Sequence, residues 1–140
     1  EVETAAVMLG KPYSIEGVVV RGDGFGTRMI GYPTINIDTE NMLLPQGVFI
    51  TQTAFPGSEK KIWGITNVGI RPTLSGTQER IETHLLHFQG SLYGRDVALS
   101  FKKRIRSEVR FETTRQLSEQ IAKDVETLKS YLRSPEISES

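Results

Sequence analysis

The feature that most constrains the fold is a series of short runs rich in β-branched and aromatic residues, separated by turns containing glycine or proline. Runs of this composition and length are typical of strands. Several strands at short spacing favour an antiparallel barrel that closes or nearly closes on itself, because closure removes exposed strand edges. We therefore expect a mainly β fold, with strands at Ile15–Arg21, Thr34–Ile37, Gly47–Thr53, Lys61–Val68, Arg80–Phe88 and Asp96–Ile105.

Turn signals between these runs predict which strands pair. Pro56 and Gly57 lie between the third and fourth runs, which we expect to form a hairpin. The segment from Gly90 to Gly94 separates the last two runs, and we expect these to form a second pair.

The C-terminal third changes to a helical period. Apolar residues recur there at spacings of three and four, which predicts one apolar stripe packed against the barrel: Leu117, Ile121, Val125, Leu128 and Leu132. Thr113 and Gln116 form a capping-box pattern at the start of this helix, and Pro135 lies beyond its end. Residues 2–9 predict a short helix at the other end of the chain.

Composition limits the classes of function. The 140 residues suit one domain, and the 17 basic and 17 acidic residues cancel, so no overall charge favours nucleic acid or an anionic membrane. The chain has no cysteine, which excludes disulfides and thiolate chemistry and suits a reducing, cytoplasmic setting. No apolar run reaches membrane-spanning length. Because the sequence begins with Glu1, we expect a processed chain or a piece of a longer one.

Residues 22–37, with the sequence GDGFGTRMIGYPTINI, form a glycine-dense loop that leads into a strand. Such a loop lets backbone N–H groups approach a phosphate closely. It is neither a Walker A loop, which needs G-x-x-x-x-G-K-[ST], nor a dinucleotide fingerprint, because Thr27 occupies the third glycine position. The alternative is a hairpin loop whose glycines supply only turn geometry.

Thr34 and Asn36 follow this loop and alternate with isoleucines, so both side chains should point to one face of a strand. Their neutral oxygens are donors that Mg²⁺ accepts when nucleotide phosphates and water complete its coordination. The alternative is a pair of buried polar residues that satisfy nearby backbone groups.

A second group of polar residues lies in Ile81–Phe88. On a strand, Glu82 and His84 share one face and Thr83 and His87 the other. Glu82 is a candidate general base. A zinc site is a weak interpretation, because the chain has two histidines and no cysteine, and hydrogen-bonded structural roles are the alternative for both histidines.

The third group is Lys102–Phe111, in which five of ten residues are basic. A nucleic-acid patch, a solvated turn, and a flap that closes on a planar ring are three interpretations of this segment. The neutral charge of the chain and the absence of interleaved aromatic residues disfavour the first.

Taken in order, these motifs resemble riboflavin kinase, in particular the kinase domain of the bacterial bifunctional riboflavin kinase/FAD synthetases. The resemblance extends from about residue 2 to residue 132. It rests on G-x-G-x-G-T-R-x-x-G-Y-P-T-I-N at Gly22–Asn36, N-V-G-x-R-P-T at Asn67–Thr73, E-T-H-L-L-H-F at Glu82–Phe88, L-Y-G at Leu92–Gly94 and R-S-E-x-x-F at Arg106–Phe111.

The resemblance implies a six-stranded antiparallel Greek-key barrel with a C-terminal helix, and transfer of the ATP γ-phosphate to the riboflavin 5′-hydroxyl. It implies Mg²⁺ on Thr34 and Asn36, and Glu82 as the catalytic carboxylate. The residues that it assigns to ATP binding are Gly22, Arg28, Thr34, Leu85, His87 and Tyr93. The residues that it assigns to riboflavin or FMN are Arg106, Val109 and Phe111, in a flap segment that spans residues 106–111.

The same resemblance predicts the organisation of the chain. Residues 1–14 are expected to be a connector from an adenylyltransferase domain, residues 15–133 the kinase domain, and residues 134–140 a disordered tail. Without that second domain, the chain should make FMN but not FAD. Neither nucleic acid nor a membrane is an expected partner.

The chain departs from the family pattern at a few positions. Ile35 replaces a usual alanine, Arg28 stands where lysine is also common, and Ser107 and Val109 vary within the flap segment. Two other classes of protein fit the barrel expectation. One is a non-catalytic barrel that binds a flavin or nucleotide, and the other is a barrel that binds single-stranded nucleic acid.

Overall fold

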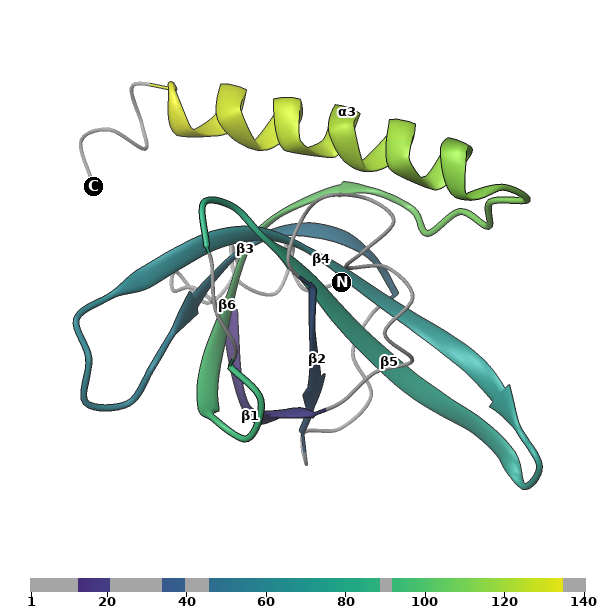
Figure 1. Cartoon of the computed structure of the whole chain (residues 1–140), viewed down its shortest axis with the longest axis horizontal. Helices are drawn as coiled ribbons and strands as arrows, with labels where there is room; N and C mark the ends of the chain where they lie inside the picture. The colour runs from purple at the N-terminus through teal and green to yellow at the C-terminus, as the bar shows by residue number, and fades with distance from the viewer. Residues whose placement is uncertain (1–12, 21–33, 40–45, 89–91, 135–140) are drawn as a thin grey trace.

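The computed structural model describes residues 13–20, 34–39, 46–88 and 92–134. In these residues, six antiparallel strands close into a barrel, and one long helix lies across its outer surface (Figure 1). The expected fold class, mainly β with a closed six-stranded barrel and a C-terminal helix, is confirmed. The expected helix at residues 2–9 and the tail after residue 134 lie outside the described residues.

Around the barrel the strands follow the order β1-β2-β5-β4-β3-β6, and all neighbouring pairs are antiparallel. Hairpins connect β3, β4 and β5, and β2 lies beside β5. These four strands, in the order β2-β5-β4-β3, therefore form a Greek key. The strand bounds are β1 (Tyr13–Val20), β2 (Thr34–Asp38), β3 (Gly47–Ala54), β4 (Lys61–Thr73), β5 (Gly76–Leu85) and β6 (Asp96–Arg106).

One predicted pairing is wrong. The hairpin of β3 and β4 forms as expected, but β5 pairs with β2 and β4, whereas β6 pairs with β1 and β3. The reason is that β4 continues past Val68 to Thr73 and turns through Leu74 and Ser75 into β5. This long hairpin occupies one edge of β5, and β2 occupies the other.

Among the described residues, the barrel interior holds mainly apolar side chains together with a short chain of hydrogen-bonded threonines. Phe49 and Phe101 pack edge to face, with ring centroids 5.1 Å apart, within the main buried cluster. Thr66 hydrogen-bonds through its hydroxyl to the hydroxyls of Thr51 (2.7 Å) and Thr83 (2.8 Å), so these buried groups satisfy one another.

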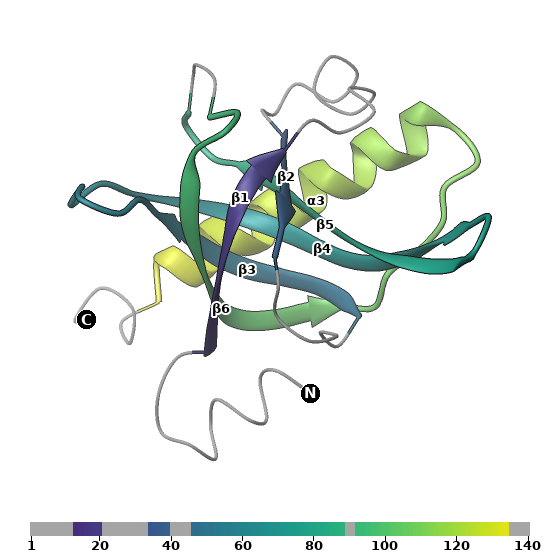
Figure 2. The same cartoon turned by 90° about the horizontal axis from the view of Figure 1, so that it is seen from below.

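The helix α3 (Thr114–Leu132) covers part of the outer surface of the barrel (Figures 1 and 2). Its Leu128 is buried with Val48, Ile50 and Ile65, which project outward from β3 and β4. The predicted cap is confirmed: the Thr113 hydroxyl accepts from the Gln116 N–H, and the Gln116 side chain accepts from the Thr113 N–H. The flap segment connects the end of β6 to the start of this helix.

In the part of the chain that the structure describes, no helix is long and apolar enough to cross a membrane.

Candidate active site

Polar side chains from three neighbouring strands gather on the outer face of the barrel. Asn36 on β2 is directly opposite Glu82 on β5, and Glu82 is directly opposite Asn67 on β4. Residues directly opposite each other in an antiparallel sheet project to the same face. We call Asn36, Glu82 and Asn67 the polar row.

Burial establishes that this face is the outside of the barrel. Ile35, Ile81 and Thr83 alternate with the polar residues and are buried in the interior. Thr34 and Asn36 therefore share one face, as predicted, and so do Glu82 and His84.

Thr34 and His84 form a second polar pair beside the polar row. They are directly opposite each other, and Thr34 Oγ1 lies 2.8 Å from His84 Nδ1. Burial lowers the pKa of His84 from 6.5 to about 4; the nearby Asp124 opposes this decrease, and Arg106 adds to it. The ring is therefore neutral at pH 7, and its hydrogen bond holds the Thr34 hydroxyl in place.

The low pKa of His84 predicts a pH dependence of stability. The unfolded chain takes up this proton near pH 6.5, whereas the folded chain resists it until about pH 4. The free energy of unfolding should therefore fall as the pH decreases from 6.5 to 4, by on the order of 3 kcal/mol, at roughly 1.4 kcal/mol per pKa unit. Urea unfolding of the metal-free chain should lose this component in His84→Asn and keep it in His87→Asn. Parallel pH profiles for wild type and His84→Asn would contradict the prediction.

Glu82 forms an ion pair with an arginine on its own strand. Arg80, two residues earlier on the same face, places its Nε 2.9 Å from Glu82 Oε1, and both side chains are partly open to solvent. This contact orients the carboxylate at the surface, where a ligand can reach it.

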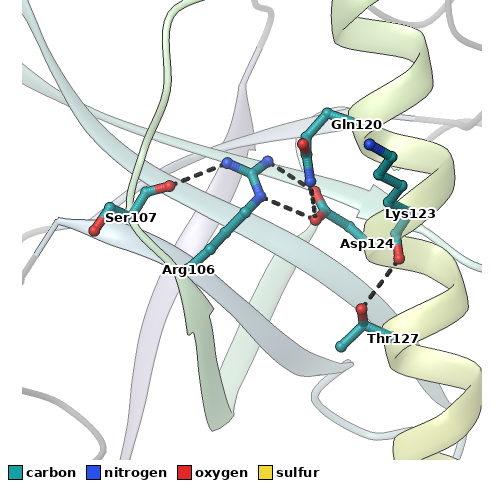
Figure 3. Close-up of polar contacts among 6 residues, drawn as sticks. All are labelled: Arg106, Ser107, Gln120, Lys123, Asp124 and Thr127. Atoms are coloured by element: carbon teal, nitrogen blue, oxygen red, sulfur yellow. Dashed lines mark hydrogen bonds and ion pairs between the residues drawn. The ribbon is translucent and has the colours of Figure 1, made fainter.

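The flap segment begins in an ion pair with the helix (Figure 3). Arg106 donates from Nε to Asp124 Oδ1 at 2.9 Å and from Nη2 to Asp124 Oδ2 at 2.8 Å. Gln120 donates to the same carboxylate at 3.0 Å, and Arg106 also donates to the Ser107 carbonyl. Asp124 is 3% exposed, so the bond joins the end of β6 to the covered side of α3.

Further along, the flap segment also contacts β4. The Glu108 carboxylate lies against the Gly69 backbone. A side chain at position 69 would collide with it, because its Cβ would be only 2.7 Å from Glu108 Cδ. Val109 is 54% exposed, and Phe111 is partly buried.

Three of the predicted nucleotide residues, Leu85, His87 and Tyr93, lie at or beyond the end of β5. Leu85 is fully buried in the barrel core, and none of the residue is exposed for a ligand to contact. His87 has a φ of 58°, which ends the strand alternation, and Tyr93 is 57% exposed. Gly22 and Arg28 lie outside the described residues.

The structure brings to the site two residues, Asn67 and Asp124, that have no role predicted from the sequence. Asn67 is the first residue of the N-V-G-x-R-P-T motif, but its position opposite Glu82 depends on the register between β4 and β5. Asp124 carried a visible signal, because it lies on the apolar stripe of the helix, three residues after Ile121 and four before Leu128.

Solved structures share this fold. A crystal structure described as a macrolide-efflux protein from Streptococcus pneumoniae matches with a TM-score of 0.80 and 30% identity, over 89% of this chain and 41% of that one. The riboflavin kinase from Trypanosoma brucei matches with a TM-score of 0.60 over 91% of this chain and 84% of that one. At 22% identity the second likeness shows the fold alone, which is a barrel of the riboflavin kinase type.

The sequence model of the Flavokinase family, described as riboflavin kinase, matches residues 9–132. The chain belongs to the riboflavin kinase family, as the order of its motifs predicted.

Bacterial relatives agree with this assignment. A bifunctional riboflavin kinase/FMN adenylyltransferase from Escherichia coli K12 is 39% identical over 128 residues, which is 91% of this chain and 40% of the relative. The protein of the same description from Bacillus subtilis is 39% identical over 89% of this chain and 40% of the relative. The chain thus spans about two fifths of the length of these relatives.

Proposed function

We propose that the chain transfers the γ-phosphate of ATP to the 5′-hydroxyl of riboflavin, producing FMN and ADP. Family membership supports the two substrates. The observation that carries the proposal is the position of the Glu82 carboxylate. It lies on the outer face of the barrel, directly opposite Asn36 and on the same strand face as the Thr34–His84 pair.

Thr34 and Asn36 are the proposed ligands of Mg²⁺. The donor set fits this ion, because a hydroxyl and an amide oxygen lie two residues apart on one face, beside a carboxylate. Mg²⁺ supplies neutralisation of the negative charge on the ATP phosphates when it is bound. His84 holds the Thr34 hydroxyl, and β1 and β5 hold the backbone of Asn36 on both sides.

Glu82 is the proposed general base. The riboflavin hydroxyl forms the new O–P bond as the bond from the γ-phosphorus to the bridging oxygen of ADP breaks, and the hydroxyl proton passes to the Glu82 carboxylate. Arg80 orients that carboxylate. Most of the rate enhancement then comes from positioning and charge neutralisation, as is general for phosphoryl transfer.

The other contacts follow the family pattern. We assign Gly22, Arg28, Thr34, His87 and Tyr93 to ATP, whereas the fully buried Leu85 has no exposed surface for a contact with the nucleotide. Because Asp124 holds the Arg106 guanidinium, we expect Val109 and Phe111 to provide the direct flavin contacts, while Arg106 fixes the flap segment.

The relatives are named as bifunctional enzymes, and the matched part is about two fifths of their length. We propose that this chain acts joined to an FMN adenylyltransferase domain. The 140 residues alone should form FMN without converting it to FAD.

A direct assay tests the proposal. The purified chain is incubated with riboflavin, ATP and Mg²⁺, and the flavins are separated by chromatography. We expect FMN to accumulate, no FAD to form, and EDTA to stop the reaction. Flavin binding without FMN would indicate a non-catalytic barrel, and salt-sensitive oligonucleotide binding without flavin affinity would indicate a nucleic-acid barrel.

A further inference from the structure

Asn67 has a side-chain oxygen that nothing in the described part of the chain satisfies. Its Oδ1 is inaccessible to solvent, and no hydrogen-bond donor among the described residues reaches it. A buried acceptor without a donor costs free energy, so native structures contain few of them, and each needs an explanation.

The position of Asn67 supplies a functional explanation. On one side it is directly opposite Glu82, the proposed base; on the other it is directly opposite Val48 of β3. Val48 in turn pairs with Arg106, the first residue of the flap segment. Asn67 therefore lies on the outer face between the proposed base and the start of the flap segment.

A second contact puts the flap segment close to Asn67. Gly69 is two residues further along β4, so it lies on the same face as Asn67, and the Glu108 carboxylate rests against it. A substrate with its planar ring under the flap segment and its reacting hydroxyl at Glu82 must extend across Asn67.

We propose that the Asn67 side-chain oxygen accepts a hydrogen bond from a hydroxyl on the polyol chain of riboflavin, next to the hydroxyl that is phosphorylated. This inference rests on the proposed function. Cross-strand neighbours such as Glu82 and Asn67 bring their side-chain ends close together, which suits adjacent hydroxyls on one carbon chain. Asn67 would thus select the acceptor substrate and place its 5′-hydroxyl at Glu82.

The test replaces Asn67 with leucine, which has a similar size and no acceptor. We expect the Kd of riboflavin, measured by flavin fluorescence in the presence of ADP and Mg²⁺, to rise by about tenfold to a hundredfold. The KM for ATP should stay near the wild-type value. Stability should not fall, because the substitution removes an unpaired polar atom.

Thr53 offers a matched control. Its hydroxyl is also buried without a hydrogen-bond partner among the described residues, but the residue is on β3 opposite Ile62 and Leu99, away from the polar row. Thr53→Val should leave the Kd of riboflavin unchanged and should not reduce stability.

A substrate analogue separates a direct contact from a structural effect. Wild type should bind 4′-deoxyriboflavin more weakly than riboflavin. The ratio of the two Kd values should be about the factor by which Asn67→Leu raises the Kd of riboflavin. Asn67→Leu should bind the two flavins equally, because the hydrogen bond is already lost.

Each outcome decides the inference. If wild type forms FMN but binds 4′-deoxyriboflavin as tightly as riboflavin, the inference is wrong and the proposed function stands, whether or not the variant folds. An unchanged riboflavin Kd in a folded Asn67→Leu protein leads to the same conclusion. If wild type forms no FMN, the proposed function fails, and the inference fails with it.

Discussion

Replacing Glu82 with glutamine should reduce the kcat of riboflavin phosphorylation by roughly 10²- to 10⁴-fold, the range that general-base catalysis contributes. Glutamine keeps the size of the side chain and a hydrogen-bond acceptor, but it cannot take the hydroxyl proton. Stopped-flow or steady-state kinetics would give kcat, and fluorescence titration would give the Kd of riboflavin, which should change far less than kcat.

Glu79→Gln is the matched control for this substitution. Glu79 is on the same strand but is separated from Glu82 by three positions, so it points to the opposite face. Its kcat should remain close to that of wild type. A Glu82→Gln enzyme with nearly normal turnover would contradict the assignment of the base.

Replacing Asp124 with alanine should lower the free energy of unfolding by about 3 kcal/mol, because the Arg106 guanidinium would lose both carboxylate bonds at a largely buried site. The same change should weaken riboflavin binding, since the ion pair joins the start of the flap segment to α3. Urea unfolding and fluorescence titration measure the two effects separately.

Glu126→Ala tests whether any acidic residue of this helix would behave in the same way. Glu126 faces solvent, and its contact with Lys129 is long, at 3.8 Å, between exposed side chains. Its loss should change stability by less than about 1 kcal/mol. Equal stability losses in the two variants, or an unchanged riboflavin Kd in Asp124→Ala, would contradict the role given to the ion pair.

Local patterns in the sequence predicted the elements of the fold well. The capping box at Thr113, the apolar stripe around Leu128 and the hairpin across Pro56–Gly57 depend on residues close in the chain, and all three are confirmed. The pairing predicted for the last two strands was wrong because strand order depends on distant contacts. The length of β4 determined the pairing of β5, because β4 extends to Thr73 and forms a hairpin with β5.

The same distinction applies to the site. The two-residue alternation correctly put Thr34 with Asn36, and Glu82 with His84, on shared faces. The alignment of Asn36, Glu82 and Asn67 across three strands is a matter of register, which a single sequence does not reveal. The burial of Asp124 similarly follows from where α3 packs on the barrel.

The most direct test of the central claim follows the phosphorus atom itself. ATP labelled at the γ-phosphate is incubated with riboflavin, Mg²⁺ and the purified chain, and the label is traced by chromatography. The account predicts that the label appears in FMN in equal amount to the ADP formed, and that Glu82→Gln nearly abolishes this transfer. Release of the label as free phosphate with riboflavin unchanged, or no use of ATP at all, would contradict it.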